Sequence, residues 1–127
     1  AIAKRILLRT PEYHDVRILI GRTNAWQGNY EQAEMHFRKV LEEDNTYEDT
    51  YNAYVDNEIW QGDYETALQV IEQGLERHPQ SKSFLARKIK ILGYLDKQKE
   101  AQKTYDLLKK LDADYKELPN LKKHIGE

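Results

Sequence analysis

Cysteine is absent from this chain of 127 residues. Neither a disulfide nor a thiolate zinc site can therefore hold the fold together, and this absence is compatible with any compartment. No apolar run approaches the roughly 20 residues that a membrane-spanning helix needs, and the opening AIAKRILLRTPEY lacks the long apolar core of a signal peptide. The sequence therefore predicts no transmembrane segment in this chain.

The motifs that anchor common catalytic mechanisms are also missing. There is no P-loop, no GxGxxG, no HExxH and no GxSxG. The sequence therefore offers no motif for a phosphate-binding loop, for a hydrolytic zinc site or for a nucleophilic serine on a strand-to-helix turn. The histidines fall at unrelated positions and are not expected to converge on a metal; they are His14, His36, His78 and His124. We predict that the chain is not an enzyme and needs neither a cofactor nor a metal.

Charge is balanced overall but unevenly distributed. The formal net charge is −2, which argues against a general nucleic-acid binder, because such proteins gain affinity by displacing phosphate counterions with basic groups. Residues 1–81 carry 8 Lys and Arg against 15 Asp and Glu, whereas residues 82–127 carry 12 against 7. This asymmetry indicates either an electrostatically polarised molecule or a dedicated site for an anionic partner.

What the sequence does contain is a repeat. WQGNYEQA begins at Trp26 and WQGDYETA begins at Trp60, which is 34 positions later. One more step of 34 reaches Tyr94, where YLDKQKEA keeps the first aromatic residue and the last Ala. A fixed period in this range is typical of a stacked array in which each unit buries its apolar face against its neighbours.

The aligned copies predict helical hairpins. A small residue recurs where two helices approach closely, and a large residue follows four positions later on the same helical face. A turn residue recurs where the first helix must end, and a helix breaker recurs after the second. These columns are Ala33, Ala67 and Ala101; Phe37, Ile71 and Tyr105; Gly28, Gly62 and Asp96; and Pro11, Asn45 and Pro79. Helical spacing further predicts that Val16, Leu19, Ile20 and Thr23 form the inward face of the first hairpin.

This arrangement resembles the tetratricopeptide repeat. The positions that match its consensus are Gly21, Gly28, Tyr30, Ala33, Phe37 and Asn45 in a repeat that starts at His14, and Val55, Gly62, Tyr64, Ala67, Ile71 and Pro79 in the next. The third repeat, from Lys82, departs from the consensus at several positions and keeps Ala101. The resemblance covers about residues 1–115.

The resemblance implies an all-α fold, namely a right-handed superhelical solenoid of antiparallel helix pairs with about three full repeats and a terminal helix at each end. We expect one domain over 1–127, divided into 1–13, 14–47, 48–81, 82–115 and a capping helix or linker at 116–127. The expected helices are 2–9, 13–26, 30–43, 47–60, 64–77, 81–94 and 98–111, with a short one within 115–124 that starts or breaks near Pro119.

In this architecture the first helix of each repeat lines a concave groove, and residues three or four apart on it form a stripe. The stripes place a charge ladder, Arg22, Asp56 and Lys90, beside an aromatic ladder, Trp26, Trp60 and Tyr94. The charges either neutralise one another between neighbouring helices or recognise a ligand, and the aromatic residues either bind in the groove or pack. The candidate groove-binding residues are Ile18, Arg22, Trp26, Asn52, Asp56, Trp60, Lys90 and Tyr94.

Exposed aromatic anchors among charges suit an extended peptide better than a small metabolite. We therefore expect a non-catalytic module that binds a protein or peptide, with a carbohydrate-binding accessory and a structural spacer or self-association module as alternatives. The carboxylate clamp by which some tetratricopeptide proteins hold chaperone tails is not expected. Its positions read Ile18, Arg22, Ala53, Ser83 and Arg87, and only Arg87 matches the clamp pattern outright.

A narrower resemblance concerns location. DVRILIGRTNAWQGNYEQA and YNAYVDNEIWQGDYETAL are similar to the periplasmic repeat segment of YaiO-type outer-membrane proteins, in which GRTYAW and WSGNY-like elements recur; GRTNAW departs from the pattern at Asn24. The resemblance implies that this chain is the N-terminal part of a longer outer-membrane protein and lies in the periplasm. A cytoplasmic location is the alternative, and the sequence leaves the oligomeric state open.

Overall fold

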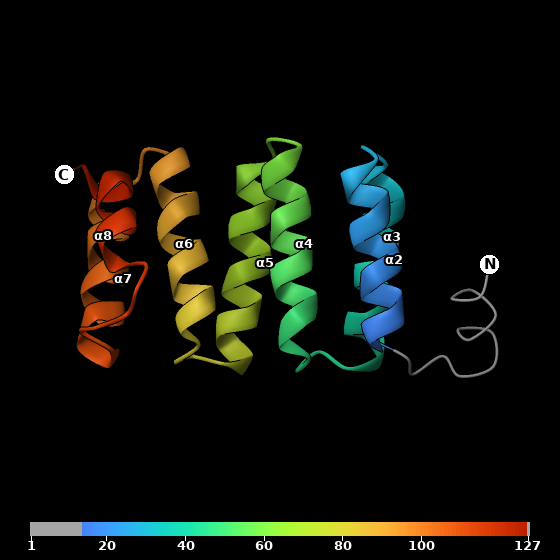
Figure 1. Ribbon diagram of the computed structural model, residues 1–127, viewed down its shortest axis with the longest axis horizontal. Helices are drawn as coiled ribbons and strands as arrows, with labels where there is room; N and C mark the ends of the chain where they lie inside the picture. Colours follow the sequence, from blue (N-terminus) through green and yellow to red (C-terminus); the bar gives the residue numbers. More distant parts are fainter. Residues whose placement is uncertain (1–13, 127) are drawn as a thin grey trace. The chain divides into compact units, whose positions relative to one another are not determined.

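The structure is a computed structural model that describes residues 14–126 (Figure 1). It divides into two compact units between Gly62 and Asp63, and each unit is described by itself. The helix expected over 2–9 and the breaker Pro11 lie outside the described residues.

The described part of unit 1 contains three helices: α2 (His14–Trp26), α3 (Tyr30–Glu43) and α4 (Glu48–Trp60). Helix α3 packs against both α2 and α4, and α2 also contacts α4. Unit 2 consists of α5 (Tyr64–Arg77), α6 (Lys82–Tyr94), α7 (Gln98–Leu111), α8 (Leu118–Leu121) and the 3₁₀ helix η1 (Lys122–Ile125). These bounds confirm the all-α fold of antiparallel helix pairs, and the six long helices agree with the expected ranges to within one residue.

The turns within the hairpins explain this agreement. Gly28 and Gly62 adopt φ angles of 81° and 84°, and Asp96 takes the same left-handed conformation with φ 58°. The amide of Asn29 then donates to the carbonyl of Asn24 at 2.8 Å, as Lys97 does to Leu92 in the third copy. This six-residue closure satisfies carbonyls at the end of the first helix. The turn geometry is therefore retained in the third copy although Asp replaces Gly.

Helix α2 meets α3 at a contact that admits only glycine. A Cβ atom added to Gly21 would lie 2.5 Å from Cε1 of Phe37. Phe37 is fully buried, as is Ala33 one turn earlier on α3. The two backbones therefore approach closely because a residue without a side chain faces an aromatic ring.

The buried face of α2 differs from the expected one. Leu19 was expected to point inward, but its side chain is 57% exposed. The buried residues of α2 are Ile18, Gly21 and Ala25. These three residues have helical spacing around Gly21, so the glycine contact sets which face of α2 turns inward.

Unit 2 ends in a short cap. Leu118, Leu121 and Ile125 are buried, and α8 and η1 both contact α6 and α7. A Cβ atom on Gly93 would lie 2.7 Å from Cβ of His124, so η1 rests directly on the backbone of α6. The short helix expected within 115–124 is confirmed in a shorter form that starts at Leu118, with Pro119 in its first turn.

The remaining repeat positions are buried or exposed according to their place in the repeat. Ala67 and Ala101 are fully buried. Tyr30 and Tyr64, which open α3 and α5, are partly exposed, and Pro79 is exposed directly after α5 ends at Arg77. The consensus positions therefore separate into buried contacts, turns and helix ends.

The contact between Gly21 and Phe37 yields a stability prediction. Gly21→Ala should lower the free energy of unfolding by about 1–2 kcal/mol, because the strain of overpacking exceeds the better helix propensity of Ala. Urea unfolding followed by circular dichroism measures the change. In a Phe37→Leu background the ring is gone, and the same substitution should be neutral or stabilising. An equal loss in both backgrounds would contradict the proposed contact.

Candidate functional site

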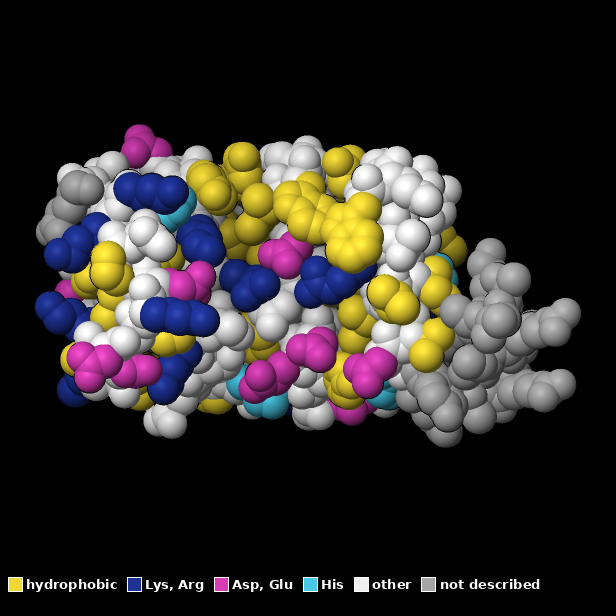
Figure 2. All heavy atoms as spheres, in the orientation of Figure 1, with side chains coloured by type: hydrophobic (Ala, Val, Ile, Leu, Met, Phe, Trp, Pro, Cys, Tyr) yellow, Lys and Arg dark blue, Asp and Glu magenta, His cyan; other side chains and the backbone are white. Residues whose placement is uncertain are grey.

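Among the described residues of unit 1, the most exposed aromatic side chains lie at the ends of two neighbouring helices. Trp26 is the last residue of α2 and is 64% exposed; Trp60 is the last residue of α4 and is 46% exposed. Figure 2 shows hydrophobic side chains gathered between the upper ends of α2 and α4, with basic and acidic side chains beside them. We call Arg22, Trp26, Asp56 and Trp60 the tryptophan surface.

An ion pair underlies this surface. Arg22 Nη1 donates to Asp56 Oδ2 at 3.4 Å. Each partner precedes its tryptophan by one helical turn, so the ion pair joins α2 to α4 next to the aromatic rings. Both side chains are partly exposed, and a pair of this kind contributes about 0–1 kcal/mol. For these two residues the structure supports neutralisation between neighbouring helices.

Two further candidates of unit 1 lie differently. Ile18 was expected in the groove, but it is 6% exposed and belongs to the core, because it lies on the same helical face as Gly21. Its place among the binding candidates is therefore wrong. Asn52 is partly buried, and its Oδ1 accepts no hydrogen bond from the described residues.

The candidates of unit 2 contact other residues of unit 2. Lys90 Nζ lies 3.8 Å from Glu117 Oε1. The Tyr94 ring centroid lies 4.9 Å from that of Tyr64 and 5.3 Å, edge-on, from that of His124. Tyr94 nevertheless stays 46% exposed. Packing therefore accounts for part of the Tyr94 surface, while one side of the ring remains accessible.

The environment of His124 alters its acidity. Burial against α6 lowers the pKa of His124, and the positive charges of Lys123 and Lys90 lower it further. The neutral imidazole is therefore the form that the folded cap favours.

Helix α4 contains a buried polar cluster that was not predicted from the sequence. Glu58 is buried; it accepts from Gln61 Nε2 at 2.6 Å and from Asn57 Nδ2 at 3.4 Å. Asn57 Nδ2 also donates to the carbonyl of Tyr30 at 3.3 Å. The sequence does indicate that Glu58 faces inward, because it continues the helical spacing of Tyr51 and the residues after it. This cluster ties the last turn of α4 to the start of α3.

A second polar network joins α3 to α4. The Tyr54 hydroxyl donates to Glu34 Oε1 at 2.7 Å and accepts from Arg38 Nε at 3.2 Å, while Arg38 Nη2 and Glu34 Oε1 are 2.8 Å apart. Burial, together with the hydrogen bond to Glu34, raises the pKa of Tyr54 to about 12. The phenol therefore remains protonated and acts as a fixed link between the two helices.

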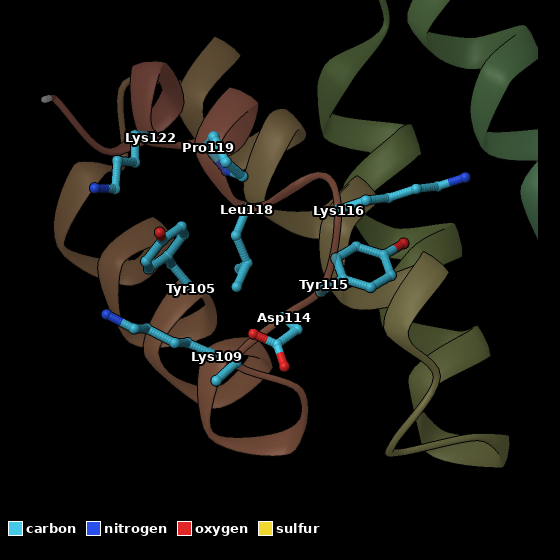
Figure 3. Close-up of a pocket in the computed structure, with 9 residues that line it drawn as sticks. Tyr105, Lys109, Asp114, Tyr115, Lys116, Leu118, Pro119 and Lys122 are labelled. Carbon is cyan, nitrogen blue, oxygen red and sulfur yellow. The ribbon is translucent and has the colours of Figure 1, made fainter.

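A small pocket opens in unit 2 beside the cap (Figure 3). Its volume is about 330 Å³. It lies between the second half of α7, the loop after α7, and the start of α8 and η1. The expected groove residues do not line this pocket. The one related feature of the sequence is the excess of basic residues after position 82.

Within the described residues, no three metal-binding side chains come together. No helix in that part of the chain is both long and apolar enough to cross a membrane.

Comparisons with known proteins agree with the geometry. The family of the tetratricopeptide repeat matches residues 27–90. The first tetratricopeptide domain of human RPAP3 aligns with a TM-score of 0.77 at 19% identity, covering 90% of this chain and 91% of that one. No curated protein sequence matches significantly.

Two further solved structures have the same fold. The first domain of Spaghetti (RPAP3) bound to the HSP90 peptide SRMEEVD aligns with a TM-score of 0.75 at 19% identity, covering 87% of this chain and 89% of that one. MamA aligns with a TM-score of 0.79 at 13% identity, covering 98% of this chain and 71% of that one.

The acidity of His124 yields a prediction on pH. Its folded pKa is lowered from 6.5, so the unfolded chain binds the proton more readily. The contribution to stability is complete above the unfolded pKa and is lost as pH falls through 6.5 toward the folded value. Between about pH 7.5 and about pH 5.5, the free energy of unfolding should fall more steeply for the natural chain than for His124→Gln. Parallel profiles from urea unfolding would contradict the assignment.

Proposed function

Because this chain belongs to the tetratricopeptide repeat family, whose members are typically non-catalytic interaction modules, we propose that it binds an extended peptide segment of a partner protein through the tryptophan surface. The observation that carries the proposal is the exposure of Trp26 and Trp60 at the ends of two adjacent helices. Tryptophan is one of the residue types that are enriched among those that dominate the binding energy of protein interfaces.

The chemistry of the surface indicates what the peptide offers. Arg22 and Asp56 neutralise each other, so neither presents a full uncompensated charge to a partner. The tryptophan rings provide apolar area and an indole N–H donor. We therefore expect a peptide that is anchored by an apolar or aromatic side chain, with its backbone carbonyls within reach of the indole donors.

The surface differs from what a chaperone tail needs. Two solved structures with this fold are complexes of RPAP3 domains with the HSP90 peptide SRMEEVD and the HSP70 peptide SGPTIEEVD, and both peptides end in EEVD. In this chain the clamp positions on α2 and α4 include Ile18 and Ala53, and both are buried. A terminal carboxylate would find no pair of polar side chains at these positions, so we do not propose an EEVD tail as the ligand.

Unit 2 adds a second candidate surface at Lys90 and Tyr94. Lys90 is compensated by Glu117, and the accessible side of Tyr94 presents one aromatic face. We propose that this surface, taken by itself, binds a peptide more weakly than the tryptophan surface does, because Tyr94 already packs against Tyr64 and His124.

The proposal predicts that binding and stability respond differently to one change. Trp26→Ala should lower the free energy of unfolding by no more than about 1 kcal/mol, since the side chain is mostly exposed. It should raise the dissociation constant of a bound peptide by about 30-fold, because an aromatic anchor of the interface is lost. Peptides selected from a random display library against the natural chain, titrated by tryptophan fluorescence and by calorimetry, provide the measurement.

Met35→Ala is the matched control, because Met35 is 69% exposed on α3 and lies outside the tryptophan surface. It should leave affinity unchanged. Saturable binding of cellohexaose or chitohexaose in place of peptide would favour the carbohydrate alternative. A loss of stability of about 3–5 kcal/mol in Trp26→Ala or Trp60→Ala would favour the structural spacer, because truncation of a buried aromatic side chain costs that much.

We further propose a periplasmic location, which is supported by the similarity of the repeat elements to those of YaiO-type outer-membrane proteins. The prediction is that the native protein that carries this segment is recovered with the cell envelope and has a mass well above 15.1 kDa. Fractionation of the source cell followed by intact-mass analysis measures both. A cytosolic species near the mass of this chain would overturn the proposal.

A further inference from the structure

The pocket of unit 2 has apolar side chains at its base and lysine side chains at its edge. Leu118 and Tyr105 are nearly buried and form its inner wall. Figure 3 shows the Lys109 and Lys122 side chains extending to the same side of the pocket, with the Tyr105 ring between them. Two ammonium groups and a phenol hydroxyl therefore border one apolar depression.

These donors have no partners among the residues that the structure describes. The ion pairs that use lysines of unit 2 involve Lys82, Lys88 and Lys90. Within residues 14–126, Lys109, Lys122 and the Tyr105 hydroxyl make no hydrogen bond or ion pair. One acidic residue, Asp114, lines the pocket, and it lies on the loop away from both ammonium groups in Figure 3. The pocket thus has uncompensated positive charge on one side.

The geometry points to a second binding site, distinct from the tryptophan surface, and we propose that it takes an acidic peptide segment in which an apolar side chain is flanked by carboxylates. The apolar side chain would fill the depression over Leu118 and Tyr105. The flanking carboxylates would accept from Lys109, Lys122 and the Tyr105 hydroxyl. Charge-assisted hydrogen bonds of this type are stronger than neutral ones, and opposite charge also raises the rate of association.

The volume is consistent with this ligand. About 330 Å³ is at the lower end of the range for ligand pockets, roughly 300–1,000 Å³. It accommodates one leucine-sized side chain with part of its backbone, whereas a folded domain has to use the surrounding surface. The excess of basic residues after position 82 extends the attraction beyond the pocket, because charges of one sign attract an acidic segment over about a Debye length.

The experiment uses the whole chain and a capped, fluorescein-labelled pentapeptide, Asp-Glu-Leu-Glu-Asp, followed by fluorescence anisotropy. We expect saturable binding that weakens several-fold when NaCl is raised from about 0.05 M to about 0.5 M. The amide version, Asn-Gln-Leu-Gln-Asn, and the polar version, Asp-Glu-Ser-Glu-Asp, should each bind at least about tenfold more weakly, because each lacks one of the two required features.

Charge reversal locates the site. A double variant that carries Lys109→Glu and Lys122→Glu should bind the peptide at least about tenfold more weakly. Lys99→Glu with Lys103→Glu is the matched control, since it makes the same change of charge at exposed positions of α7 that do not line the pocket. Trp26→Ala should also bind normally, which separates this site from the tryptophan surface. Thermal unfolding of each variant confirms that it is folded.

Several results would overturn the proposal. These are absence of binding, equal loss in the two double variants, and equal binding of the leucine and serine peptides, which would indicate a merely ionic attraction. Competition by inorganic phosphate at concentrations similar to those of the peptide would assign the lysines to a small anion instead. Salt-sensitive dimerisation of the chain, abolished by the Lys109 and Lys122 changes, would assign the pocket to a second copy.

Discussion

The fold depends on how closely paired helices can approach. Where α2 crosses α3, the approach leaves no room for a single methyl group, because the Phe37 ring occupies the space beside Gly21. The cap of unit 2 uses the same device, with η1 lying against Gly93. At each contact an absent side chain on one helix is matched by a large or cyclic one opposite. Close packing of this kind gives dispersion contacts and also fixes how each helix is rotated about its own axis.

That rotation decides which residues are free to bind. With Gly21 turned inward, Ile18 and Ala25 follow it into the core, and Arg22 and Trp26 are left on the surface. Helix α4 presents Asp56 and Trp60 in the corresponding positions, one period later in the sequence. The repeat therefore places the same chemical types at the same ends of neighbouring helices. The candidate binding surface therefore follows from how the helices pack.

The sequence predicted the helices well because their ends are local events. A left-handed residue or a capping side chain, such as Asp63 accepting from the Thr66 amide, acts within a few residues and is visible in the repeat. The inward face of α2 was predicted less well. Leu19 and Ile18 are equally apolar neighbours, and only the contact with Phe37 on another helix decides between them. Tertiary contacts chose the face, whereas periodicity alone allowed either.

The candidate sites divide in the same way. The tryptophan surface was foreseeable, because its residues recur at the period of the repeat. The pocket of unit 2 was not foreseeable, because it is assembled from the end of α7, a loop and the cap, which share no repeat position. The buried Glu58 continued an apolar spacing, but an acidic residue at such a position is expected in solvent. Its hydrogen bonds to Gln61 and Asn57 make its burial tolerable.

The placement of the tryptophans has a consequence for optical measurements on this protein. The chain contains two tryptophans, and both belong to unit 1, at the ends of α2 and α4. Indole emission therefore reports the local state of unit 1, whereas tyrosines are the aromatic chromophores native to unit 2. Because Trp26 is 64% exposed and Trp60 46% exposed in the native state, unfolding changes the surroundings of Trp26 less than those of Trp60. Far-ultraviolet dichroism, which samples all helices, and indole emission thus see different parts of the same molecule.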